Sequence, residues 1–249
     1  MIGLLRSLQR TAAAKPLEPS RLVIGSEVLD VVFRRHAQAR RLVLRLNTSG
    51  TGVVVTVPKG VSRSKALDFT ERSLGWIEER IRSRGRLIRL EHGHVISLRG
   101  VNHEIRQVDS RRGVVSLEAG TGLIHVPGDP AHISRRLLDF LKAEARADLT
   151  QASRRYAALM GVSFRRIAIR DQRSRWGSCS SAGELSYSWR LILTPDYVLD
   201  YVAAHEVAHL RHLDHSARFW RLVLTHCPNA ARAKNWLRQH GQEVHRVVV

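Results

Sequence analysis

The sequence predicts an α+β fold, on two observations. Short apolar alternation typical of β-strands fills two separate segments, residues 21–57 and 95–126. Helical periodicity fills other segments, of which the longest covers residues 130–160. Strand-rich and helix-rich segments therefore occur in one chain, and an α+β class follows.

A chain of 249 residues can form one large domain or two small ones. We expect a flexible leader over residues 1–20, an N-terminal α+β region over 21–128, and a second domain over 129–249. The boundary is set at the Pro127-Gly128 pair, which ends the second strand-rich segment. The long helix that follows can pack on either side of this boundary.

The first strand-rich segment is expected to form antiparallel strands that end at Pro58. Ser62 or Ser64 can then cap a helix that continues to about Arg84. Trp76 and Ile77 are among the large apolar residues that this helix carries.

The long helix is expected to stop at Gly161, because glycine readily adopts the left-handed conformation that ends helices. After it we expect a strand over residues 167–169, a polar loop over 173–183 and a strand over 185–193. The last strand leads directly into the segment that carries the chemistry.

The formal net charge is +19, from 41 Lys and Arg against 22 Asp and Glu. Such an excess makes nucleic acid a partner to consider. However, the arginines are spread along the chain, and aromatic residues are not interleaved with the basic runs as in a single-strand stacking platform. General solubility or weak nonspecific contact is therefore favoured over a specific nucleic-acid site.

A cytoplasmic protein is expected from the cysteines and the hydropathy. Cys179 and Cys227 form no CxxC pair and are too few for a disulfide framework. No apolar run reaches the roughly 20 residues needed to span a membrane, and the apolar stretch after Met1 is too short for a secretory signal. We expect no membrane association. The oligomeric state is left open.

A metal site is predicted on a helix expected over residues 195–210. Thr194, Pro195 and Asp196 form a typical helix start, with a capping hydroxyl, a proline at the first position and an early acid. His205 and His209 are four residues apart, so both imidazoles can reach one ion from adjacent helical turns.

Glu206 points beside that ion, where it can take a proton from an activated water molecule. A catalytic zinc site needs a third protein ligand and an open position. Candidates are His212, Asp214 and His215. His212 on a continued helix would have its Cα about 10 Å from that of His205. His215 can fold back from beyond the helix end, and is favoured.

The sequence resembles the YgjP-like metallopeptidases, which are similar to the SprT-like and WLM zincins. The likeness is carried by Ser174-Arg175-Trp176-Gly177-Ser178-Cys179-Ser180, Leu185 to Leu193, Asp200-Tyr201-Val202, His205 to Leu210, His215-Ser216 and Phe219-Trp220. The specific part covers residues 164–223, and a looser likeness covers the N-terminal part. Val207 stands where leucine is more usual, which does not touch the chemistry.

The resemblance implies a zincin-like catalytic domain that binds Zn²⁺ through His205, His209 and His215, with Glu206 catalytic. The expected function is a zinc metallopeptidase that hydrolyses peptide bonds in a peptide or protein substrate through a zinc-activated water, with Glu206 as general base. The alternative is a nucleic-acid-associated protein that uses a zincin scaffold, either as a DNA-recruited protease or as a binding module.

Three further residues and one segment have open roles. Tyr187 or Arg190 could steady the oxyanion, and the sequence does not choose between them. Residues 185–193 could pair with an extended peptide or form an ordinary core strand. Cys179 could be a fourth zinc ligand, but a buried structural thiol is favoured.

Overall fold

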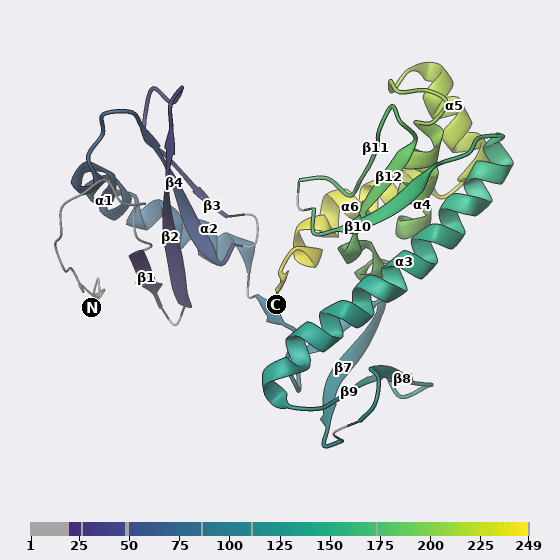
Figure 1. The fold of residues 1–249 in the computed structure, drawn as a ribbon, viewed down its shortest axis with the longest axis horizontal. Coiled ribbons are helices and arrows are strands. Elements are labelled where there is room, and N and C mark those ends of the chain that lie inside the picture. The colour runs from purple at the N-terminus through teal and green to yellow at the C-terminus, as the bar shows by residue number, and fades with distance from the viewer. Residues whose placement is uncertain are drawn as a thin grey trace. The chain divides into compact units, whose positions relative to one another are not determined.

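The structure, a computed structural model, describes residues 20–25, 27–47, 50–85, 87–110, 112–172 and 174–248 (Figure 1). The expected leader lies outside these ranges except for Ser20. The chain divides into two compact units, residues 1–86 and 87–249. The division falls after Arg86, whereas the boundary expected from the sequence was at residue 128.

The first unit contains a four-stranded sheet of β1 (Ser20–Ile24), β2 (Glu27–His36), β3 (Val43–Leu46) and β4 (Gly52–Pro58), in the order β1-β2-β4-β3. The two outer pairings are antiparallel, as expected. The central pairing of β2 with β4 is parallel, which corrects the expectation of an all-antiparallel sheet. Alternation within a strand shows which face is buried but not the direction of the neighbouring strand.

Two helices cover this sheet, α1 (Arg63–Arg72) and α2 (Leu74–Arg84). Ser62 caps α1, because its hydroxyl accepts a hydrogen bond from the Lys65 backbone N–H. Ala66 and Ile77 bury their side chains in the same core as the alternating valines of β4. The one helix expected here is therefore two, interrupted at Ser73.

The second unit begins with β5 (Ile88–Arg89) and a four-stranded sheet of β6 (Val95–Leu98), β7 (Val101–Val108), β8 (Ser116–Glu118) and β9 (Leu123–Pro127). The strand order is β6-β7-β9-β8. The short 3₁₀ helix η1 (Pro130–His132) then leads into the long helix α3 (Ile133–Met160), which Gly161 ends at a φ of 64°. The predicted long helix and its stop are confirmed.

The sheet β6–β9 shares a single core with α3, and this explains where the unit boundary falls. Ile105 and Ile124 of the sheet and Leu137 and Leu141 of α3 are all fully buried in one cluster. Because the strands bury their apolar face against α3, they fold with the helix rather than with the preceding strands.

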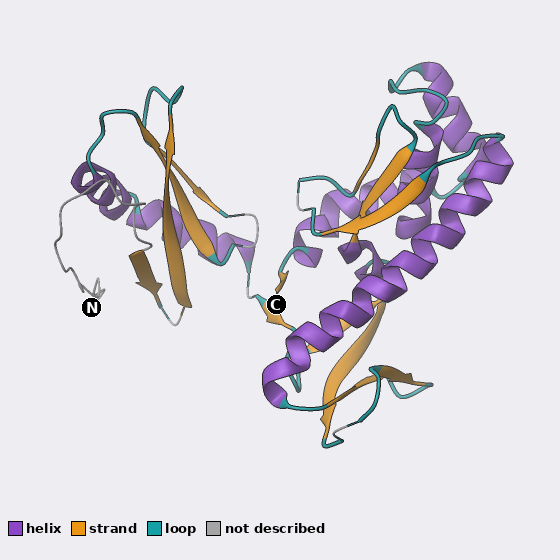
Figure 2. Ribbon diagram, viewed as in Figure 1, coloured by secondary structure: helices purple, strands orange, loops and turns teal. Residues whose placement is uncertain are grey.

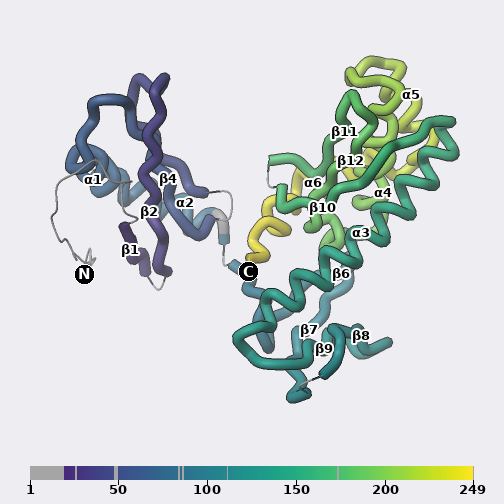
Figure 3. The backbone as a smooth tube through the Cα atoms, in the orientation of Figure 1, coloured from purple at the N-terminus to yellow at the C-terminus, as the bar shows by residue number. Residues whose placement is uncertain are grey.

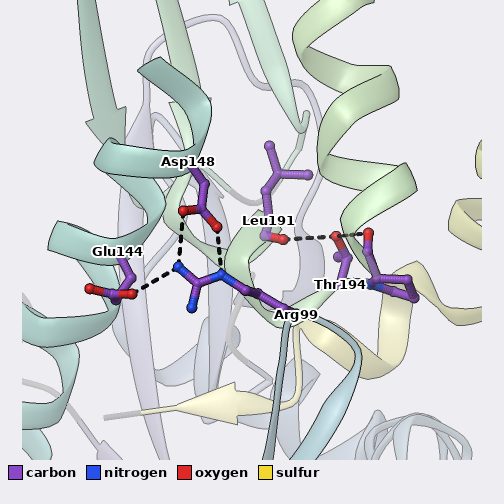
Figure 4. A network of polar contacts seen from close by, with 6 residues as sticks. Arg99, Glu144, Asp148, Leu191 and Thr194 are labelled. Atoms are coloured by element: carbon purple, nitrogen blue, oxygen red, sulfur yellow. Dashed lines mark hydrogen bonds and ion pairs between the residues drawn. The ribbon is translucent and has the colours of Figure 1, made fainter. Parts of the chain in front are cut away.

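The tip of the β6–β7 hairpin is fastened to α3 by Arg99 (Figure 4). Its Nε and one terminal nitrogen donate to the two oxygens of Asp148, at 2.7 and 2.9 Å. The same terminal nitrogen donates to Glu144 at 2.8 Å. Arg99 has a φ of 52°, and its backbone N–H donates to the carbonyl of Ile192 at 2.7 Å. The hairpin thus reaches the chain just before the predicted metal helix.

A second sheet follows α3, with β10 (Arg166–Arg170), β11 (Gly177–Cys179) and β12 (Glu184–Ser188) in the order β10-β12-β11. The strand expected over 185–193 ends at Ser188, and the 3₁₀ helix η2 (Trp189–Leu193) takes its place. Strand β12 pairs with β10 on one side and β11 on the other. Its backbone is therefore not open to an extended peptide, which corrects that possibility for this segment.

Three helices complete the second unit: α4 (Asp196–Ala208), α5 (Ala217–His226) and α6 (Ala230–Val244) (Figure 2). The last strand, β13 (Val247–Val248), pairs with β5, so the two ends of this unit lie together (Figure 3). The α+β class is confirmed. Among the described residues, no helix combines the length and the apolar character that crossing a bilayer requires.

Candidate metal centre

Helix α4 carries the predicted site, and most of its residues are buried. Val198, Val202 and Ala203 lie in the core, and Asp196 occupies the first turn. The expected cap is wrong: Pro195 is the N-cap, and the Thr194 hydroxyl donates instead to the carbonyl of Leu191 at 2.7 Å. Thr194 therefore closes η2 rather than opening α4.

Three imidazoles converge at the C-terminal end of α4. His205 Nε2 lies 3.2 Å from His209 Nε2 and 3.1 Å from His215 Nε2. Helix α4 ends at Ala208, and the chain turns back through residues 210–214 before Ser216 caps α5. This turn brings His215 beside the two helical histidines, so their ligand atoms all lie within 4.8 Å of one another.

The spacing of these nitrogens fits a divalent metal ion. Three nitrogens bound tetrahedrally to zinc at about 2.0–2.1 Å would be about 3.3 Å apart. Imidazole lone pairs at such separations repel one another unless a cation or a proton lies between them. Burial lowers the pKa of His205 to about 3 and also lowers the pKa of His209, which favours the neutral rings that a metal requires.

Neighbouring groups hold the rings in place. His209 Nδ1 lies 3.0 Å from the backbone carbonyl of His212, a contact that directs Nε2 toward the centre. The buried ring of Phe219 packs below the trio, with centroid distances of 4.9, 4.5 and 4.9 Å to His205, His209 and His215. The structure brings the favoured third histidine into the group and leaves out the other two candidates, the ring of His212 and the carboxylate of Asp214.

Glu206 is buried next to this centre, with 6% of its surface exposed. Burial raises the pKa of its carboxyl to about 7, and the positive charge of Arg175 opposes this shift. A carboxyl that titrates near neutral pH is suited to take up and release a proton.

Gly177 of β11 makes room for this carboxylate. A Cβ at position 177 would lie 2.6 Å from Cγ and 2.7 Å from Oε1 of Glu206. No role for Gly177 was expected from the sequence. A glycine inside a strand often marks close approach by another group. The segment 173–183 was expected to be a polar loop, but it contains the strand β11, so this indication was missed.

Tyr187 and Arg190 both belong to the core. Tyr187 is fully buried, and its hydroxyl lies 3.0 Å from the Ser153 hydroxyl of α3. Arg190 is also fully buried, forms an ion pair with Asp171, and donates to the Val247 carbonyl at 3.2 Å. These contacts account for the burial of both residues, and the oxyanion role of either stays a prediction.

Cys179 lies outside the histidine trio. Burial raises the pKa of its thiol to about 11, with a further contribution from the charge of Glu206. A bound metal would itself displace this proton, so the position of the sulfur outside the trio, and not its pKa, bears on a role as ligand. The structure thus gives no support to Cys179 as a fourth ligand.

Three converging imidazoles on and beside a helix that also carries a buried glutamate are typical of metal-dependent hydrolases. Residues 40–240 match the family described as YgjP-like, metallopeptidase domain. The chain belongs to this family, as its sequence motifs predict, and its activity class is that of a metallopeptidase. A comparison with curated proteins gave no match.

Proposed function

We propose that this protein is a zinc-dependent metallopeptidase in which His205, His209 and His215 hold the metal and Glu206 is the general base. The convergence of three Nε2 atoms next to Glu206 is the observation that carries the proposal. Three nitrogen ligands with tetrahedral spacing suit zinc, and an all-imidazole set leaves a fourth position for solvent.

Zinc, when bound, supplies a Lewis acid that polarises a carbonyl group and lowers the pKa of a water molecule. Glu206 takes the proton from the attacking water and passes it to the leaving amine. Its burial supports this role, because a carboxyl whose pKa is raised to about 7 can both take up and release a proton near neutral pH. Gly177 keeps the space that the carboxylate occupies.

The open edge of β11 offers a place for a peptide substrate. The carbonyl of Trp176 accepts from the Ser188 N–H, and the N–H of Ser180 donates to the Glu184 carbonyl, so both face β12. Because pairing alternates along an antiparallel strand, the N–H and C=O groups of Gly177 and Cys179 face the other edge. A peptide that pairs with this edge would pass close to Glu206.

The test is hydrolysis of denatured casein by the zinc-loaded wild type and by Glu206→Gln. Wild type is expected to cleave casein, and Glu206→Gln to lose at least about 100-fold in rate while keeping one zinc per chain. Cleavage by the variant at the wild-type rate would remove Glu206 from the mechanism.

Cytoplasmic action is part of the proposal, supported by the two free cysteines Cys179 and Cys227.

A second candidate function is nucleic-acid association, favoured by a basic groove of about 750 Å³ along α3. Lys142, Arg146 and Arg154 line it together with small, polar and apolar residues, and none of the described lining residues is acidic. Phosphate groups could bind there. The protein should then retard DNA in a gel, and this retardation should weaken steeply as the salt concentration rises. Variants in which Lys142, Arg146 and Arg154 are replaced should not retard DNA. Retardation that does not depend on salt would argue against nucleic-acid association.

A further inference from the structure

A groove between α5 and α6 adjoins the metal centre. Its volume is about 720 Å³. Trp220 and Leu224 line it from α5, and Lys234 and Arg238 line it from α6. The remaining lining residues are small or neutral: Ala230, Ala231 and Asn235.

Trp220 connects this groove to the metal ligands. Its ring centroid lies 5.8 Å from the centroids of both His205 and His215. Lys234 Nζ lies 4.3 Å from the centroid of the Trp220 ring, so the ammonium group stands one ring away from the ligands. A substrate residue next to the cleaved bond can therefore reach Lys234.

The groove is cationic and partly apolar. Among the described residues, neither Lys234 nor Arg238 has a carboxylate partner, and Arg238 donates only to the side-chain oxygen of Asn235, at 2.7 Å. Leu224 is 54% exposed and supplies an apolar surface beside these cations. Two cations above an apolar wall suit a ligand with a short hydrocarbon stem and a carboxylate head.

We infer that this groove binds the side chain of an acidic residue, glutamate above all, beside the bond that the enzyme cleaves. The inference rests on the proposed peptidase function and adds to it a substrate class. The methylenes of glutamate would pack against Trp220 and Leu224, and its carboxylate would meet Lys234 and Arg238. An internal residue is favoured over a chain terminus, because the groove follows α6 for about 12 Å from Ala230 to Arg238 and does not close around a chain end.

The groove fits a peptide better than a single-stranded nucleic acid. Base stacking needs open aromatic faces. Trp220 is the one aromatic side chain among the described residues that line the groove, and Lys234 lies over its ring. Acidic peptide side chains need only the cations and the apolar wall.

The test compares short fluorescent peptides, amidated at the C-terminus, in which one glutamate moves along an otherwise neutral sequence. Matched peptides carry glutamine instead, and one glutamine peptide has a free C-terminal carboxylate. Binding is measured by anisotropy with zinc-loaded Glu206→Gln, and cleavage with the wild type. We expect one glutamate position to bind about 3- to 10-fold tighter than its glutamine match, and the difference to shrink at high salt.

Lys234→Glu in the same background should abolish this preference and favour a lysine peptide instead. Lys59→Glu, an exposed change of equal charge in the first unit, should leave the preference unchanged. If Lys234→Glu does not fold, as judged by its thermal midpoint, Lys234→Gln should still remove the preference.

An unchanged preference in the Lys234 variants would overturn the inference, and so would an equal effect of Lys59→Glu. Tighter binding only of the peptide with the free C-terminal carboxylate would also overturn the inference, since the groove would then bind a chain terminus and not a side chain. Because binding is measured without cleavage, failure of the peptidase proposal would appear separately, as a wild type that binds but does not cleave.

Discussion

Gly177 and Glu206 are packed so closely that position 177 has no room for a side chain. The Cβ of any other residue would lie 2.6 Å from Cγ and 2.9 Å from Cδ of the glutamate. The backbone of Gly177 does not adopt a positive φ, so glycine is needed here for space rather than for conformation. The edge strand β11 therefore helps to set the position of the carboxylate on α4.

The first prediction is that Gly177→Ala lowers peptide hydrolysis by at least about 10-fold, because the added methyl displaces the Glu206 carboxylate. Zinc stoichiometry should stay at the wild-type value, since the three histidines are not touched. Gly75→Ala is the control, because a Cβ at Gly75 in α2 meets nothing within 4 Å. An unchanged turnover rate in Gly177→Ala would show that the carboxylate does not depend on this space.

The second prediction separates the candidate third ligands by metal analysis. His215→Ala should lose zinc affinity by at least about 100-fold, because it removes one of three nitrogens. His212→Ala should keep its zinc, because His209 contacts the backbone carbonyl of His212 and not its ring. The reverse order of zinc affinities would assign the third ligand to His212.

The third prediction concerns the buried Tyr187. Tyr187→Phe removes the hydroxyl that pairs with Ser153 and should lower the free energy of unfolding by about 1–2 kcal/mol. Its turnover of a peptide substrate should stay within about threefold of the wild-type rate. A fall in turnover of about two orders of magnitude with little loss of stability would instead support Tyr187 as the group that stabilises the oxyanion.

The fourth prediction concerns the Arg99 network. Arg99→Ala should lower the free energy of unfolding of the second unit by about 1–2 kcal/mol, because it leaves Asp148 and Glu144 without their shared partner. Arg106→Ala should change it by less than about 0.5 kcal/mol, since the Arg106–Glu104 pair is more exposed. Urea denaturation of both variants measures the difference. Equal losses in the free energy of unfolding would show that the Arg99 network stabilises the unit no more than an exposed ion pair does.

Local patterns in the sequence predicted much of this fold. The stop of α3 at Gly161 and the placement of His205 and His209 at the end of α4 depend on interactions within a few residues, which sequence patterns report directly. The position of His215 was also accessible, because a chain that leaves a helix after His209 can return within six residues.

Long-range packing was not accessible in the same way. The parallel pairing of β2 with β4 leaves the same alternation as antiparallel pairing. Residues 189–193 are apolar enough for a strand, yet they form the buried 3₁₀ helix η2, which contacts α3 and α4. The observed unit boundary differs from the expected one at residue 128 because Ile105 and Leu137 share a core, and local sequence patterns do not reveal such a contact. The role of Gly177 likewise depends on a contact 29 positions away along the chain, with Glu206.

The most direct test of the central claim is anomalous diffraction at the zinc edge from crystals of the zinc-loaded protein. The account predicts one strong peak at about 2.0–2.1 Å from the Nε2 atoms of His205, His209 and His215, with no other protein atom as ligand. A peak elsewhere, or a fourth bond from a protein atom such as the Cys179 sulfur, would contradict it.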